Sequence, residues 1–414
     1  MPRRKLALLL IPAGIAIAGL SSSYMMPLDH EAIEYAKGPV DDVVSHLQER
    51  LDKGELKLKY EGEFGYLRSV LHELNIPESS QVLVFSKTSF QSPRISPRTP
   101  RALYFNDKVA VGFVRTGEVL EVAALDPRQG IMFYSLDQER ASRPRFERRD
   151  VCLQCHQSGA TLGVPGLMVR SVTPDRNGTP VAGAGGFITD HKSPLKERWG
   201  GWYVTGTTGM QVHMGNAVVQ EAGEVAEGTR NVTDLRPYVD AGAYLTPHSD
   251  IVALMTLEHQ TQMDNLMIRV GWEARVAMSE NRAINKSLGE PVEQVRPSIQ
   301  HRIDVAVEEL LQYMLFRGEA VLTGPVKGTS GFAEEFAKQG PRDSQGRSFR
   351  DFDLKKRLFL YPCSYMIYSD AFDAMPAIVK DRLYRRIWEE ADPSVIAILR
   401  ETKKGLPAYW SEGR

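Results

Sequence analysis

The chain has 414 residues, of which 42% are hydrophobic and 25% are charged, as is ordinary for a soluble globular protein. Its 51 lysines and arginines nearly balance its 52 aspartates and glutamates, so the overall charge does not favour nucleic acid as a partner, and we expect none. The length exceeds what one hydrophobic core usually supports, which predicts two or three domains, or one core domain with a large addition.

The N-terminus has the pattern of an export signal. Arg3, Arg4 and Lys5 precede a run of apolar or small residues at 6–20, and three serines follow. As a helix this run would extend about 22 Å, which is shorter than the roughly 30 Å hydrocarbon core of a bilayer. We therefore expect residues 1–23 to be a cleaved signal peptide of a periplasmic or otherwise exported bacterial protein. If it stays uncleaved, this segment is the expected route to membrane association.

Residues 24–138 are expected to form two short helices and then an antiparallel sheet. Apolar residues at helical spacing indicate the helices, and Asp41 or Asp42 can cap the first of them. Short runs rich in β-branched and aromatic residues predict strands at 81–85, 102–105, 109–114, 119–124 and 130–136. The connection at 91–101 contains three prolines and three arginines, which predicts an extended surface loop.

Residues 139–234 begin with a basic run and continue into a glycine-rich stretch. The run can be a solvated linker or a contact for anionic groups or an acidic redox partner, and it comprises Arg140, Arg143, Arg145, Arg148 and Arg149. Between the two lies Cys152-Leu153-Gln154-Cys155-His156, which uses two of the three cysteines in the chain. The glycines are consistent with backbone that passes close to a flat cofactor, or with tight turns between short strands.

The spacing of this motif is typical of covalent haem attachment, in which each thiol adds to one vinyl group and the histidine ligates the iron. The motif resembles that of c-type cytochromes. The resemblance implies one covalently attached haem c, bound by Cys152 and Cys155 and ligated by His156. Residues 199–216 and 361–365 also resemble uncharacterised exported proteins with a cytochrome c domain, which implies no particular activity.

Residues 235–414 are expected to be mainly helical. A long helix begins at a cap on Ser249 or Asp250 and runs to about residue 280, and a second begins at Pro297. The polar stretch at 327–353 is the best candidate for a mobile loop or linker, and residues 354–399 return to helix. The fold class is therefore α+β, with an N-terminal antiparallel sheet region, a glycine-rich haem segment and a mainly helical C-terminal part.

Three other uses of the two cysteines stay open at this point. A structural zinc site would need two more ligands, and no second Cys or His pair follows at short spacing. A redox-active dithiol would open a helix after a strand, which the basic run does not suggest. A disulfide between such close cysteines is uncommon. Cys363 is expected to be a buried thiol that packs as a small apolar residue, with a regulatory or intermolecular role as the alternative.

The sixth iron ligand would separate the possible functions, because His or Met there gives an electron-transfer site and an open position gives ligand or oxidant chemistry. We favour His213 as this metal ligand, followed by Met214, His259 and Met210; His191 is a further candidate. Each of them can instead be an ordinary core residue. Glycine-rich, strand-like sequence follows the motif where a compact helical cytochrome domain would be expected, so the haem is expected at the junction of sheet and helices.

The function predicted from these features is electron transfer by an exported haem c protein, with a redox protein or a small oxidant as partner. A periplasmic haem enzyme of the peroxidase or oxygenase type, with an open or weakly ligated sixth position, is the alternative, because the chain is far longer than one electron-transfer haem needs. A non-catalytic redox sensor or docking subunit is the third possibility.

Overall fold

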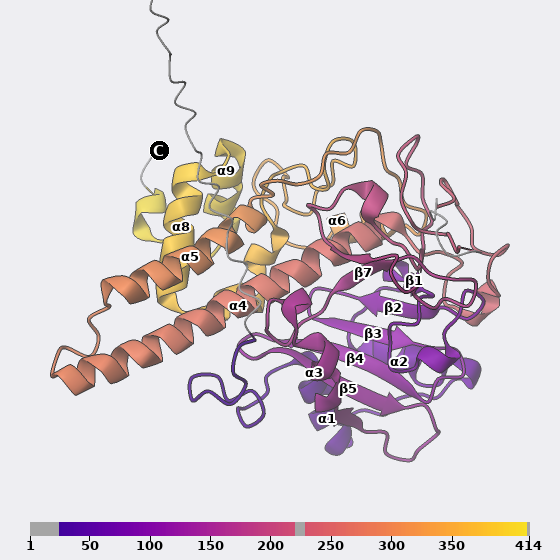
Figure 1. Cartoon of the computed structure of the whole chain (residues 1–414), viewed down its shortest axis with the longest axis horizontal. Coiled ribbons are helices and arrows are strands. Elements are labelled where there is room, and N and C mark those ends of the chain that lie inside the picture. Colours follow the sequence, from indigo (N-terminus) through magenta and orange to yellow (C-terminus); the bar gives the residue numbers. More distant parts are fainter. Residues whose placement is uncertain (1–24, 220–227, 412–414) are drawn as a thin grey trace, which may run out of the picture.

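The computed structural model describes residues 25–219 and 228–411, so the predicted signal segment at 1–23 lies outside the described residues. The predicted fold class is confirmed: the chain is α+β, with an antiparallel sheet in the N-terminal half and a mainly helical C-terminal part. Figure 1 shows the sheet on one side of the long helix α4 (Ile251–Leu288) and the helices α5, α8 and α9 on its other side.

A seven-stranded antiparallel sheet forms the N-terminal half, in the order β6-β5-β4-β3-β2-β1-β9. Its strands are β1 (Val82–Val84), β2 (Arg101–Phe105), β3 (Val109–Phe113), β4 (Val119–Asp126), β5 (Gly130–Asp137), β6 (Phe146–Arg148) and β9 (Trp202–Tyr203). The five predicted strands are confirmed within a few residues, whereas the two edge strands are additions. Arg101, predicted to end a surface loop, instead begins β2, because its backbone pairs with Val84 of β1.

The two faces of the sheet are covered by different elements, as the alternation of side chains along its strands requires. One face packs against α1 (Val43–Asp52) and α2 (Leu67–Glu73) in the smaller hydrophobic cluster. The opposite face of the sheet packs against α4. Its side chains are part of the larger hydrophobic cluster, which continues into the C-terminal helices. The predicted cap of the first helix is Asp42, whose side chain accepts from the N–H groups of Val44 and Ser45.

Helix α4 begins after Asp250, whose side chain caps it, and ends at Gly289 in the left-handed conformation. It is eight residues longer than predicted, since it ends at Leu288 and not at about 280. In the extra turns, Asn281 and Asn285 donate side-chain hydrogen bonds to the carbonyls of Gln294 and Pro291 in the following loop. Helix α5 (Pro297–Met314) begins at the predicted proline and packs along α4.

The remaining helices are short. They are α3 (Leu153–His156), α6 (Phe332–Ala337), α7 (Asp370–Ala374), α8 (Ala377–Glu390) and α9 (Pro393–Thr402), and a separate hairpin pairs β7 (Val169–Val172) with β8 (Gly186–Thr189). The prediction of a free linker at 327–353 is wrong: this stretch contains α6, and its Phe336 and Phe349 are buried because they pack in the larger cluster.

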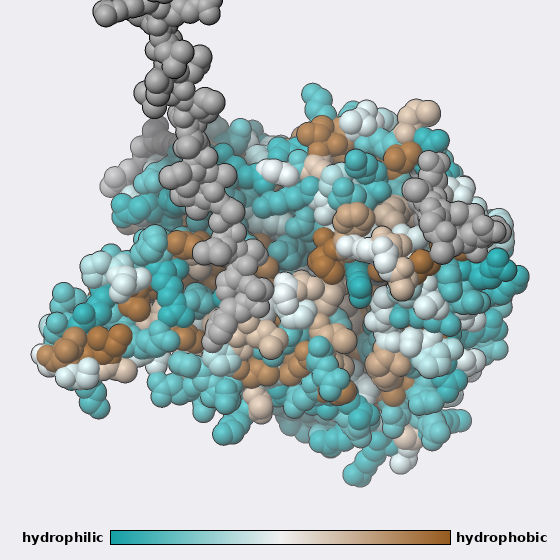
Figure 2. All heavy atoms as spheres, in the orientation of Figure 1, coloured by the Kyte–Doolittle hydropathy of each residue, from teal (hydrophilic) through white to brown (hydrophobic). Residues whose placement is uncertain are grey.

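The surface is mostly hydrophilic on the face shown in Figure 2, with scattered apolar patches. One patch lies at the end of the α4–α5 hairpin, where Ile284, Leu288 and Val292 are exposed. Among the described helices, none is long and apolar enough to cross a membrane.

Candidate haem site

The cysteine motif lies on a short helical segment in front of the sheet. A 3₁₀ turn at Asp150–Cys152 continues directly into α3, which ends at His156. In helical backbone, residues three and four positions apart share a face, so Cys152 lies beside both Cys155 and His156. Both cysteines are free thiols, one half-buried and the other exposed. The segment therefore presents two thiols and an imidazole on adjoining positions, next to β4 and β5 (Figure 1).

His156 is oriented by the loop that follows it. Its Nδ1 atom lies 2.9 Å from the carbonyl oxygen of Gly166, and the Gly166 N–H donates back to the His156 carbonyl at 2.9 Å. A carbonyl can only accept, so Nδ1 carries the proton and the lone pair is on Nε2. Burial lowers the pKa of His156, which keeps the ring neutral. This is the state in which an imidazole binds a metal, with its second nitrogen held by a backbone carbonyl.

The surroundings of Cys152 differ from those of a reactive dithiol. Burial raises the pKa of the Cys152 thiol, with the nearby Glu121 carboxylate adding to the effect. Reactive cysteines in Cys-x-x-Cys motifs have a lowered pKa, because a cation or a helix N-terminus stabilises the thiolate. The electrostatics at Cys152 therefore do not favour a reactive thiolate.

The sheet forms the floor beneath the motif. The ring of Phe133, on β5, lies 4.9 Å from the His156 ring, centroid to centroid. Across the sheet lie Glu121 on β4 and Arg101 on β2, which form an ion pair with side chains 14% and 22% exposed. The site is thus bounded by an aromatic ring on one side and by a partly buried pair of opposite charges on the other.

No family model matches the chain, and no curated protein or solved structure matches it either. Its chemistry is therefore argued from its own residues. Among residues 25–219 and 228–411, no three His, Cys, Asp or Glu side chains converge as a metal-binding group.

The preferred sixth ligand, His213, is buried among residues other than those that contact the motif. Its Nδ1 accepts the N–H of Gly215 at 3.1 Å, and its ring packs edge-on against Trp199 at 5.5 Å. Burial lowers the pKa of His213 to about 4, with Arg230 adding to the effect. With Nδ1 as an acceptor, the proton is on Nε2, so this tautomer would have to change before Nε2 could bind iron.

The methionine candidates differ in exposure. Met210 is 84% exposed. The sulfur of Met214 lies 3.6 Å from the hydroxyl of Ser171 on β7. Of the two, Met214 is therefore the one whose thioether contacts a strand that follows the His156–Gly166 loop.

His191 and His259 come together in the helical core. Their Nδ1 atoms lie 2.8 Å apart, and the Nε2 of His259 lies 2.8 Å from the Ser364 hydroxyl. Both ring nitrogens of His259 thus have protein partners, which leaves none for iron. The Tyr313 ring stacks on His191 at 3.9 Å, and beside the pair Cys363 is fully buried, as expected for a structural thiol.

Part of the basic run is used within the fold. Arg148 donates to the carbonyl of Tyr35 and pairs with Asp150, and Arg149 donates to the Ser135 hydroxyl at 2.7 Å. Arg140 and Arg143 are exposed and are the members that a partner or a haem propionate can approach.

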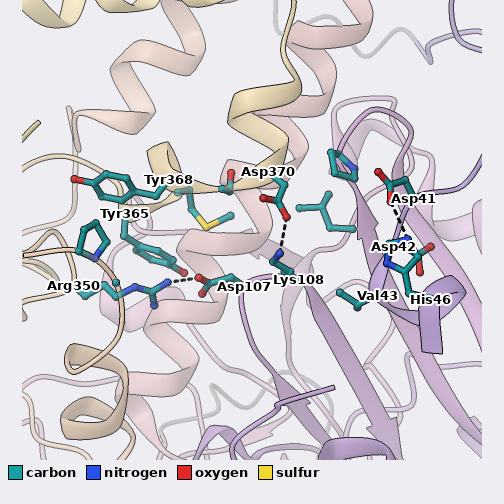
Figure 3. Close-up of a pocket in the computed structure, with 16 residues that line it drawn as sticks. Asp41, Asp42, Val43, His46, Asp107, Lys108, Arg350, Tyr365, Tyr368 and Asp370 are labelled. Carbon is teal, nitrogen blue, oxygen red and sulfur yellow. Dashed lines mark hydrogen bonds and ion pairs between the residues drawn. The ribbon is translucent and has the colours of Figure 1, made fainter. Parts of the chain in front are cut away.

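A cavity of about 330 Å³ lies elsewhere, between α1, the β2–β3 turn and residues 340–370. Figure 3 shows charged pairs across it, with Arg350 pointing at Asp107 and Lys108 at Asp370. These charges are paired with one another, but the buried Nη1 of Arg350 has no hydrogen-bond partner among the described residues.

Sequence reasoning missed Gly166, Arg101 and Glu121. A carbonyl acceptor has no side-chain signature, so Gly166 could not have been singled out. Glu121 did carry a signal: it is a carboxylate flanked by apolar residues in the strand Val119–Asp126, where burial requires a partner.

Proposed function

We propose that this chain is an exported haem c protein that acts in electron transfer. Cys152 and Cys155 would hold one haem by thioether bonds, and the Nε2 atom of His156 would ligate the iron. The bound haem would supply a one-electron ferric–ferrous couple. The observation that carries the proposal is the bond from His156 Nδ1 to the Gly166 carbonyl, at 2.9 Å, beside two free thiols on the same helical segment.

The roles of the chain's own residues follow from their places. The loop from His156 to Gly166 fixes the imidazole, and Phe133 packs beside it to limit water on that side. The exposed side chains of Arg140 and Arg143 offer positive charge to an acidic redox protein, which favours encounter of the two proteins.

A second candidate is a haem enzyme that uses a small oxidant at an open sixth position. One specific observation favours it: two of the four preferred distal ligands are poorly placed, since His259 has partners at both nitrogens and Met210 is 84% exposed. Carbon monoxide binding to the reduced protein separates the two functions. Slow or absent binding supports a six-coordinate carrier, and fast, complete binding supports the enzyme.

The test of the shared premise is the haem content of the protein after export in a bacterial host with haem c maturation. Wild-type protein should give a c-type pyridine haemochrome after denaturation, and Cys152→Ala with Cys155→Ala should give none. Cys363→Ala is the matched control, because it removes the remaining cysteine and should retain the haem. Unchanged haem content in the double variant would refute the proposal.

A further inference from the structure

A charged pair is built into the sheet floor beside the haem motif. Arg101 on β2 reaches Glu121 on β4 by crossing β3 at Gly112. A side chain at Gly112 would prevent this, since a Cβ there would lie 2.6 Å from an Arg101 guanidinium nitrogen. The glycine therefore makes room for an ion pair between two strands that are not neighbours.

The carboxylate of Glu121 has three donors around it. Besides the guanidinium of Arg101, it accepts hydrogen bonds from the Ser89 hydroxyl at 2.9 Å and from the Gln91 amide at 2.8 Å. Three donors therefore hold this carboxylate in place. At 14% and 22% exposure, the two side chains are screened by solvent much less than a surface pair.

Sheet register places this pair next to the motif. Glu121 is the cross-strand partner of Ser135, whose hydroxyl accepts the Nε–H of Arg149, and the Cys152 N–H donates to the Arg149 carbonyl. Two residues along β5 from Ser135, and on the same face, Phe133 packs against His156. Paired residues on adjacent strands have Cβ atoms about 5 Å apart. Glu121 is thus one strand away from the residues that contact the motif, and the Arg101 side chain reaches it there.

We infer that Arg101 and Glu121 are an electrostatic pair that sets the reduction potential of the iron bound at His156. The inference rests on the proposed function and deepens it. Oxidation adds a positive charge at the iron, so the Arg101 cation disfavours the ferric state and the Glu121 anion favours it. Together the two nearly cancel, and removal of either one leaves the other charge unopposed in a partly buried place.

The test is redox titration of the purified, haem-loaded protein by its visible spectrum. Arg101→Gln should lower the potential and Glu121→Gln should raise it. Each should change the ferric-to-ferrous ratio at a fixed applied potential by about tenfold, or ~59 mV for one electron. The double variant should return close to the wild-type potential, and Arg101→Lys, which keeps the charge, should stay near it.

Arg94 and Glu118 provide the matched control. They form an ion pair of the same type just before β4, but their side chains are 41% and 79% exposed. Arg94→Gln and Glu118→Gln should leave the potential unchanged, because solvent and salt screen exposed charges.

The results of these measurements distinguish a failure of the proposed function from a failure of the inference about Arg101 and Glu121. If wild-type protein carries no haem c, the proposed function fails and this inference fails with it. If haem is bound but the Arg101 and Glu121 variants match the controls, or both shift the potential in the same direction, the pair has no tuning role and the proposed function stands. Should Arg101→Gln not fold, the direction of the shift in Glu121→Gln still decides whether the charge pair tunes the potential.

Discussion

His156 and Gly166 are joined by two hydrogen bonds that run in opposite directions, from the imidazole Nδ1–H to the Gly166 carbonyl and from the Gly166 N–H to the His156 carbonyl, each 2.9 Å. Within the loop they close, the Thr161 hydroxyl bonds the carbonyl of Val164 at 2.8 Å. The imidazole is thus oriented by backbone that is itself fixed on both sides.

Gly166→Ala should disturb this arrangement. A Cβ at residue 166 would lie 2.0 Å from the side-chain oxygen of Asn265 on α4, so the loop must shift away from His156. We expect a loss of about 1–3 kcal/mol in the free energy of unfolding, as for overpacked sites, together with reduced haem content. Urea unfolding and the pyridine haemochrome measure the two effects.

Gly159→Ala is the control for this variant, because it lies in the same loop and a Cβ there meets nothing within 4 Å. It should change the unfolding free energy by less than about 0.5 kcal/mol and leave the haem content intact. If the two alanine variants behave alike, the position of the Gly166 carbonyl does not matter for haem binding.

Features that depend on neighbouring residues in the chain could be predicted from the sequence. Features that depend on contacts between distant residues could not. Helix α4 was found from local periodicity and the Asp250 cap, and strand β4 from its run of β-branched residues. Arg101 was misplaced in a loop because its role is set by Glu121, twenty positions away and across an intervening strand. Contacts of this kind arise from sheet register, which no local pattern encodes.

The same reasoning applies to the candidate site. Cys152, Cys155 and His156 could be named because their chemistry requires a fixed short spacing. The sixth ligand could not, since His213 and His259 differ in their hydrogen-bond partners and not in any sequence signal.

His259 should contribute stability and no iron ligation. His259→Phe leaves the Nδ1 of His191 and the hydroxyl of Ser364 buried without their partner. We expect a loss of about 3 kcal/mol in the free energy of unfolding, with the haem absorption spectrum unchanged. His72→Phe, at a side chain that is 84% exposed, should cost less than about 0.5 kcal/mol. A changed spectrum at full stability would instead identify His259 as the iron ligand.

His213 should make stability depend on pH. Its pKa of about 4 in the folded chain is below the value of about 6.5 expected after unfolding, because the ring is buried. Between these values the unfolded state binds more protons, so this contribution to stability is lost as the pH falls from about 6.5 to 4. Relative to His213→Gln, the wild-type protein should lose about 2 kcal/mol between pH 6.5 and pH 5.

Urea unfolding at the two pH values measures this difference, and the absorption spectrum of the same samples tests ligation. If His213→Gln shows the same pH dependence as the wild-type protein, the ring is not buried in a neutral form. If it alters the reduced spectrum, His213 is the distal ligand that the sequence predicted.

The buried pair of Arg198 and Glu258 should be the costliest ion pair to break. Its nitrogen and oxygen lie 3.1 Å apart, the side chains are 3% and 0% exposed, and Glu258 also accepts from Thr189. Glu258→Ala leaves the guanidinium buried without a counter-charge, which costs about 3–5 kcal/mol.

Glu49→Ala is the exposed control: it breaks the Lys53–Glu49 pair, 61% and 66% exposed, and should cost at most about 0.5 kcal/mol. Arg198→Met with Glu258→Leu should be less destabilised than Glu258→Ala, since no buried charge remains. Equal unfolding free energies for Glu258→Ala and Glu49→Ala would show that the β8–α4 contact does not depend on this pair.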